Sequence, residues 1–162
     1  MDVRTKRMNR LKLISKILFI LYMCAVFYVM FLADSFNRTT VTTNYRYNLK
    51  LFVEIERFRA VWNVHGPYIA LINLLGNVAC FVPFGFFVPF HSKGYRNIIV
   101  VTCLTFIFSL FIELTQLILK IGVFDVDDLL LNTIGGIIGY IGYAIAIRLY
   151  IYSRKPKKQV RK

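Results

Sequence analysis

Four long apolar runs set the pattern of the chain. Uncharged residues continue over Ile17–Ala33, Tyr68–Phe90 and Leu129–Ile147, and over Ile98–Leu119 with Glu113 as the one charged exception. Each run can cross a hydrocarbon core of about 30 Å, where backbone groups must bond within their own segment and therefore form helices. We predict an all-α integral membrane protein, a bundle of four transmembrane helices at about 12–33, 68–90, 98–119 and 129–150 in one domain over residues 1–162.

Composition and charge support this class and suggest an orientation. The 162 residues are 57% hydrophobic and 18% charged, with a net charge of +13, which is unlike a soluble domain. Lysine and arginine concentrate in the N-terminal tail, the loop at 91–97 and the tail at 151–162. The positive-inside rule therefore predicts cytoplasmic N- and C-termini. We attribute the basic tail to topology and to anionic lipid, and we expect no nucleic-acid partner.

The largest segment between the runs is the predicted outer loop at 34–67. Its apolar residues recur at helical spacing with charged residues between them: Leu51, Phe52, Ile55, Phe58 and Trp62. This pattern predicts a short amphipathic helix that lies in the outer membrane interface. The alternative is a helix packed over the mouth of the bundle.

Two helices contain residues that change their packing. Pro83 predicts a kink in the second helix, and the two interpretations are a packing kink or a broken helix that shapes a cavity. In the fourth helix, Gly135, Gly139 and Gly142 form a ridge of small residues. Such a ridge allows another helix to approach closely, either within the chain or in a homo-oligomer.

Polar residues inside the runs gather in the predicted outer half of the bundle. Carboxylates are rare in membrane spans and mark functional sites, and helical spacing places several of the polar residues on common faces. We predict an outward-facing polar cavity formed by nine residues from three helices: Asn73, Asn77, Ser109, Glu113, Gln116, Asp125, Asp127, Asp128 and Asn132.

Other roles for these residues remain open. The aspartates suit the N-terminus of a helix, while Asn77 and Asn132 could join helices by hydrogen bonds. Glu113 is harder to explain as a structural residue. It could be protonated, paired with an outer-loop arginine, or bound to a cation or a substrate amine. The candidate partners are Arg46, Arg57 and Arg59.

The chemical signals in the chain are weak. The DVDD sequence at 125–128 lacks the context of known phosphoryl-transfer motifs, and neither HExxH nor a phosphate-binding loop is present. We therefore predict a non-enzymatic protein without a cofactor. One alternative is an intramembrane enzyme that acts on an envelope lipid, with Glu113 as acid/base and the aspartates holding a divalent cation. The other is a small transporter or accessory subunit in which Glu113 titrates.

Three motifs resemble those of the VanZ-like family of small bacterial membrane proteins. They are "NLLGNVACFVPFGFFVPF" (Asn73–Phe90), "SLFIELTQ" (Ser109–Gln116) and "FDVDDLLLNTIGGIIGY" (Phe124–Tyr140). An Asn-Leu-x-Pro-Phe element of the family corresponds to "NLKLF", Asn48–Phe52, with Leu51 in place of proline.

The resemblance implies a multi-pass protein of the bacterial cytoplasmic membrane. Founding members of the family are associated with low-level resistance to teicoplanin-type glycopeptides. We therefore expect the predicted cavity to bind a lipid-linked peptidoglycan precursor or the glycopeptide itself.

Overall fold

Four long helices make up most of the part of the chain that the structure describes. The computed structural model describes residues 3–32, 44–53, 56, 58–60, 62 and 67–153. The helices are α1 (Val3–Phe27), which continues into the π-helix η1 (Tyr28–Leu32), then α3 (Pro67–His91), α4 (Ile98–Leu119) and α5 (Val126–Tyr152). Each contains a segment long and apolar enough to cross a membrane, as the sequence predicts. Shorter elements are β1 (Tyr47–Asn48), the 3₁₀ helix η3 (Lys93–Tyr95) and β2 (Phe124–Asp125).

Residues at the helix termini explain where α4 begins and ends. Asn97 precedes α4, and its side chain accepts a hydrogen bond from the Ile99 amide at 2.8 Å. This bond satisfies one of the amides that a helix leaves unpaired at its start. Lys120 follows α4 in the left-handed conformation, with φ of 57°. The chain then turns back towards α5 through β2.

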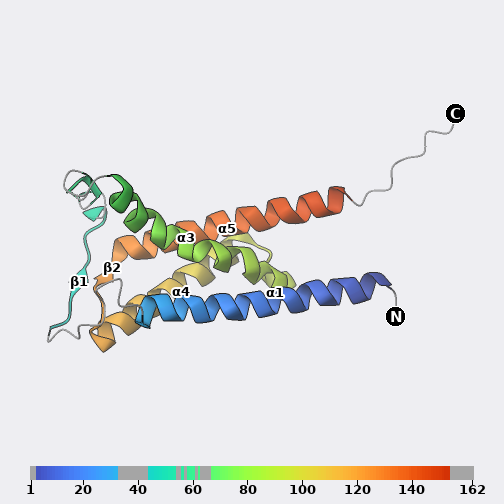
Figure 1. The fold of residues 1–162 in the computed structure, drawn as a ribbon, viewed down its shortest axis with the longest axis horizontal. Helices are drawn as coiled ribbons and strands as arrows, with labels where there is room; N and C mark the ends of the chain where they lie inside the picture. The colour runs from blue at the N-terminus through green and yellow to red at the C-terminus, as the bar shows by residue number, and fades with distance from the viewer. Residues whose placement is uncertain are drawn as a thin grey trace.

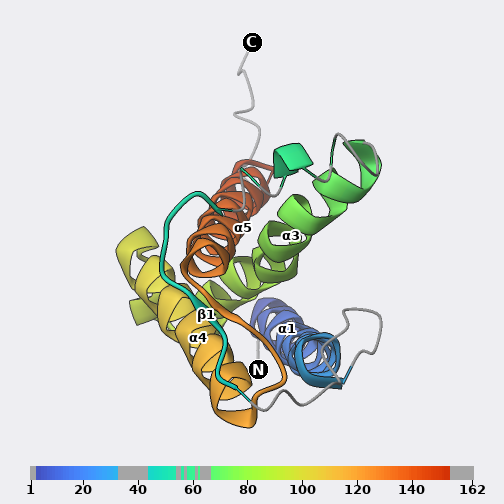
Figure 2. The same cartoon turned by 90° about the vertical axis from the view of Figure 1, so that its left-hand side faces the viewer.

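Successive helices run in opposite directions along the bundle (Figure 1). The first residues of α1 and the last residues of α5 lie at one end, whereas β1 and β2 lie at the other (Figure 1). Viewed from that second end, the segment containing β1 crosses the end of the bundle (Figure 2). The start of α1 and the end of α5 thus lie on the same side of the bundle, as the predicted topology with an even number of spans requires. The assignment of that side to the cytoplasm stays a prediction.

Glycines allow α3 and α5 to pack in close contact. A Cβ atom at Gly139 would stand 2.0 Å from the Val82 carbonyl oxygen, and one at Gly135 would stand 2.2 Å from that of Val78. On α3, a Cβ at Gly85 would stand 1.9 Å from the Gly136 carbonyl oxygen. Any side chain at these positions would separate the helices. The glycine ridge of α5 thus faces α3 of the same chain, which supports the intramolecular alternative.

Pro83 lies inside a continuous helix. Helix α3 runs from Pro67 to His91 without interruption, although it contains both Pro83 and Pro89. The broken-helix alternative is therefore not found in α3. Membrane helices tolerate proline when neighbouring elements hold the helix in place, and α3 packs along α5 and also contacts α1 and α4.

Helix α1 packs against α3 with one side and leaves most of its apolar surface exposed. Val26 and Met30 are buried against Phe81 and Ile112. The Tyr22 hydroxyl donates to the Cys80 carbonyl oxygen of α3 at 2.7 Å. On the remaining surface, large apolar side chains are open to the surroundings, including Leu13, Ile17, Leu21 and Phe27. Such a surface suits contact with lipid acyl chains.

The described part of the predicted amphipathic helix is only partly helical. Val53, Glu56, residues 58–60 and Trp62 have helical conformation. Leu51 and Phe52, with which the predicted pattern begins, instead form a turn in which Phe52 is left-handed, so the helix does not include them. The rings of Phe58 and Trp62, four residues apart, have centroids separated by 5.4 Å. Helical conformation at Phe58 and Trp62 agrees with their spacing in the sequence, and their position in the membrane interface stays a prediction.

Candidate functional site

Helix α4 presents a column of buried polar side chains towards the rest of the bundle. Thr105, Ser109, Glu113 and Gln116 are each at most 3% exposed. Thr105 satisfies its hydroxyl within the helix by donating to the Val101 carbonyl oxygen at 2.8 Å. The other three residues form hydrogen bonds to different parts of the chain. Helical spacing places them on one side of α4, as predicted.

Glu113 binds the backbone at the start of α5. Its Oε2 accepts a hydrogen bond from the Asp125 amide at 3.1 Å, and the side chain is only 3% exposed. The carboxyl group thus satisfies a buried amide just before the helix begins, where a backbone donor without a partner would be costly. This contact gives Glu113 a structural role that reasoning from the sequence did not include.

Asp125 is the N-terminal cap of α5. Its Oδ1 accepts a hydrogen bond from the Asp127 amide at 2.9 Å, which confirms the predicted capping role. The Asn48 amide group also donates to both carboxylate oxygens of Asp125, at 3.1 Å each. Asp125 therefore joins the start of α5 to β1, a segment 77 residues away in the sequence.

The next two aspartates bind different parts of the chain. Asp127 Oδ1 accepts from the Phe52 amide at 2.7 Å. Asp128 Oδ1 accepts a hydrogen bond from the Asn77 side chain of α3. We call Glu113, Asp125, Asp127 and Asp128 the carboxylate cluster. The described contacts supply it with neutral N–H donors, and the positive end of the α5 dipole favours carboxylates at this position.

Residues 44–52, which we call the strap, are the part of the 34–67 loop that contacts this cluster. Strand β1 pairs in parallel with β2, and the Phe124 amide donates to the Arg46 carbonyl oxygen at 3.1 Å. Phe52 has φ of 68°, a left-handed conformation that is unfavourable for a residue with a side chain. Its hydrogen bond to Asp127 stabilises this turn. Reasoning from the sequence did not assign Asn48 or Phe52 to the site, although both belong to the quoted "NLKLF" element.

Two further hydrogen bonds join neighbouring helices, one deeper in the bundle than the cluster and one near the same end of α4. Asn132 Nδ2 of α5 donates to Ser109 Oγ of α4 at 2.8 Å. Gln116 Nε2 donates to the Met30 carbonyl oxygen at 2.8 Å, where α1 continues as a π-helix. Within the part of the chain that the structure describes, Asn132 Oδ1 is buried without a hydrogen-bond partner. The network therefore joins all four long helices.

The structure brings together eight of the nine predicted cavity residues. These residues are Asn77, Ser109, Glu113, Gln116, Asp125, Asp127, Asp128 and Asn132. The Asn73 side chain lies outside the described residues, as does Arg57. Arg46 and Arg59 have exposed side chains, and their pairing with Glu113 stays a prediction. The predicted cavity also stays a prediction, since these side chains contact one another and the backbone through hydrogen bonds.

The enzyme alternative requires a divalent cation, and the described residues contain no preformed metal site. No group of three or more histidine, cysteine, aspartate and glutamate side chains in those ranges could hold a metal ion. The carboxylates instead have the amide partners described above.

The comparisons with known proteins extend over most of the chain. The model of the VanZ/LLP1 family matches residues 19–147. Among curated proteins, the chain is 26% identical over 148 residues to protein VanZ of Enterococcus faecium, which covers 91% of this chain and 80% of that protein. No solved structure matches the chain. The range matched by the family model contains the strap and the carboxylate cluster.

Proposed function

This chain belongs to the VanZ/LLP1 family, and from that premise we propose that it lowers the susceptibility of a bacterial cell to teicoplanin-type glycopeptides. It would act as a multi-pass protein of the cytoplasmic membrane. The support is the family match together with the relative VanZ, which aligns with 91% of the chain. Four helices suited to membrane spans support the proposed location.

The carboxylate cluster is the structural observation that most strongly supports the proposal. Buried acidic groups in a membrane bundle are costly and are usually functional. Here they gather at the end of the bundle that contains β1 and β2 (Figure 1). We propose that this end faces outward, where it would bind a lipid-linked cell-wall precursor or the glycopeptide. Exposed cations such as Arg46 and Lys50 suit a pyrophosphate, and the carboxylates suit amines of the drug.

Growth inhibition in a susceptible Gram-positive host tests the proposal. The inhibitory concentrations of teicoplanin and vancomycin would be measured with empty vector, the native chain, Glu113→Gln and Asp128→Asn at equal membrane levels. We expect the native chain to raise the teicoplanin value several-fold with little effect on vancomycin. Both variants should lose most of this protection, because each replaces a carboxylate of the cluster by a neutral amide.

Glu56→Gln is the matched control, because Glu56 is an exposed acid outside the cluster. It should protect as well as the native chain. Absence of protection by well-expressed native protein would contradict the resistance function. Full protection by both cluster variants would instead contradict the assignment of that function to the carboxylate cluster.

A further inference from the structure

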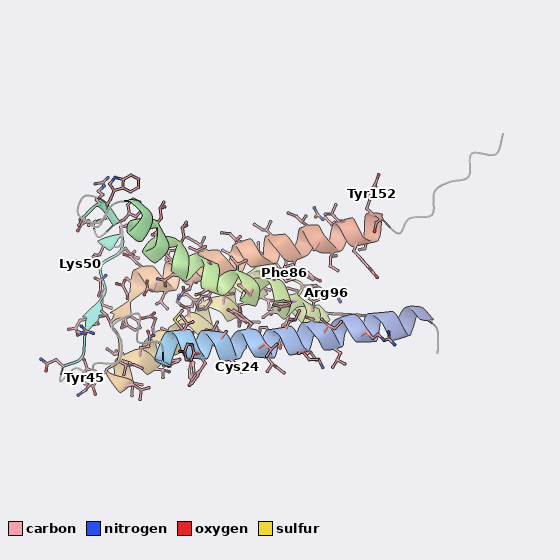
Figure 3. All side chains as sticks on the ribbon, in the orientation of Figure 1. Cys24, Tyr45, Lys50, Phe86, Arg96 and Tyr152 are labelled. Atoms are coloured by element: carbon pink, nitrogen blue, oxygen red, sulfur yellow. The ribbon has the colours of Figure 1, made fainter. Side chains whose placement is uncertain are left out.

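The strap carries a large exposed apolar surface, although the Tyr45 ring also contacts Lys120 at the end of α4, whose Nζ lies 4.7 Å from the ring centroid. Tyr45, Tyr47, Leu49, Leu51 and Phe52 are each between 58% and 66% exposed. Asn48 is the one half-buried residue of the strap, and its side chain contacts Asp125. Figure 3 shows Tyr45 and Lys50 at this end of the molecule. Five large apolar side chains in a segment of nine residues would be unfavourable in water, so this surface requires an apolar partner.

The charges of the strap restrict what that partner can be. Arg46 and Lys50 are exposed, whereas Asp125 and Asp127 beneath the strap are at most 3% exposed. The outer surface of the strap is therefore cationic and apolar, although acidic residues lie directly under it. A partner that complements this surface must carry both negative charge and hydrocarbon.

We propose that the strap is a binding surface for the phosphate layer of an anionic bilayer leaflet. Arg46 and Lys50 would contact lipid phosphates, while Leu49, Leu51 and Phe52 enter the boundary between headgroups and acyl chains. Tyrosines such as Tyr45 and Tyr47 are enriched at this depth. Cations near an anionic membrane surface and apolar side chains in the interface both favour such binding.

Lipid binding at the strap would also act on the carboxylate cluster. The same segment donates from Asn48 to Asp125 and from the Phe52 amide to Asp127. A lipid that holds the outer surface of the strap therefore stabilises these inner hydrogen bonds. Anionic lipid thus keeps the two aspartates covered.

Quenching by brominated lipids tests this surface directly. The chain has one tryptophan, Trp62, so Tyr47→Trp combined with Trp62→Phe places a single fluorophore on the strap. The full chain would be reconstituted in nanodiscs that contain either brominated phosphatidylglycerol or brominated phosphatidylcholine. We expect either lipid to quench the fluorescence of the tryptophan at position 47 strongly. The apparent affinity of this site for phosphatidylglycerol should exceed that for phosphatidylcholine by roughly fivefold for each strap cation. Arg46→Gln and Lys50→Gln should each remove about one such factor.

Arg96→Gln is the matched control, because Arg96 is an exposed cation located away from the strap (Figure 3). It should leave the lipid preference at position 47 unchanged. Equal quenching by the two lipids would overturn the recognition of anionic phosphate. Weak quenching by both lipids would overturn the interfacial position and favour a partner in the aqueous phase, such as a second protein copy.

Hydrogen exchange provides a second measurement that uses the native sequence. The amide of Phe52 should exchange several-fold more slowly in phosphatidylglycerol nanodiscs than in phosphatidylcholine nanodiscs, because lipid holds its bond to Asp127. Equal exchange in the two lipids would overturn the link between lipid and the carboxylate cluster. Neither experiment contains a glycopeptide, so failure of the lipid proposal would leave the proposed resistance function intact.

Discussion

Ser109 and Asn132 form a hydrogen bond between two membrane helices at 2.8 Å, while Asn132 Oδ1 is buried without a partner among the described residues. We expect Ser109→Ala to lower the free energy of unfolding by about 1 kcal/mol, since interhelical bonds in membrane proteins contribute about 0.6 and at most about 1.7 kcal/mol. Adding Asn132→Leu should recover this loss, because an apolar pair leaves no buried polar atom unpaired. Reversible unfolding in mixed micelles measures both changes.

Thr133→Ala is a control for the loss of a hydroxyl group. Thr133 donates to the Leu129 carbonyl oxygen of its own helix at 2.7 Å, so its removal should change stability by less than about 0.5 kcal/mol. A double variant less stable than Ser109→Ala alone would contradict the argument, because it would mean that Asn132 makes another important contact.

A residue of the site could be predicted only where it differs from its neighbours in the sequence. Glu113 and Asn132 were predicted because a polar residue in an apolar run is conspicuous. Asn48 was not assigned, because a polar residue in a polar loop gives no such signal. The Phe52 contact could not be predicted either, since the donor is a backbone amide that is present in nearly every residue type.

At the scale of helices, the contact between α3 and α5 depends on glycine. We expect Gly139→Ala to destabilise the protein by about 1–3 kcal/mol, as overpacking does elsewhere, because its Cβ would stand 2.0 Å from the Val82 carbonyl oxygen. Gly76→Ala is the matched control on α3, where a Cβ has nothing within 4 Å. Alanine there should preserve or raise stability, since glycine is a weak helix former.

The thermal midpoint in detergent and the amount of protein in the membrane measure both glycine variants. Equal behaviour of the two would contradict the packing argument. A lower oligomeric state of Gly139→Ala at unchanged monomer stability would instead indicate that the ridge joins two copies of the chain.

The elements differ in how far the sequence could predict them. The four helices follow from local composition, since a long apolar run has few other structures available in lipid. Helix α4 has the predicted bounds of 98–119. The pairing of β1 with β2 depends on contact between residues 77 apart, and two-residue strands have no recognisable periodicity. The π-helix at Tyr28–Leu32 likewise leaves no pattern in an uninterrupted apolar run.

For the whole molecule, the decisive question is which membrane face carries the carboxylate cluster. The cluster, the strap and the C-terminal end of α4 lie at one end of the bundle, and the first residues of α1 and the last residues of α5 lie at the other (Figure 1). Lysine and arginine are more frequent in the tails and the 91–97 loop than in the other two loops. The positive-inside rule therefore predicts that the strap lies outside the cell.

Cysteine labelling tests this orientation. In a chain with Cys24, Cys80 and Cys103 replaced, Lys50→Cys and Tyr95→Cys each introduce one exposed thiol. We expect a membrane-impermeant maleimide to label position 50 in intact cells and position 95 only after permeabilisation. The reverse pattern would place the carboxylate cluster in the cytoplasm. Glycopeptides act outside the membrane, so that result would rule out direct contact with the drug even if the chain conferred resistance.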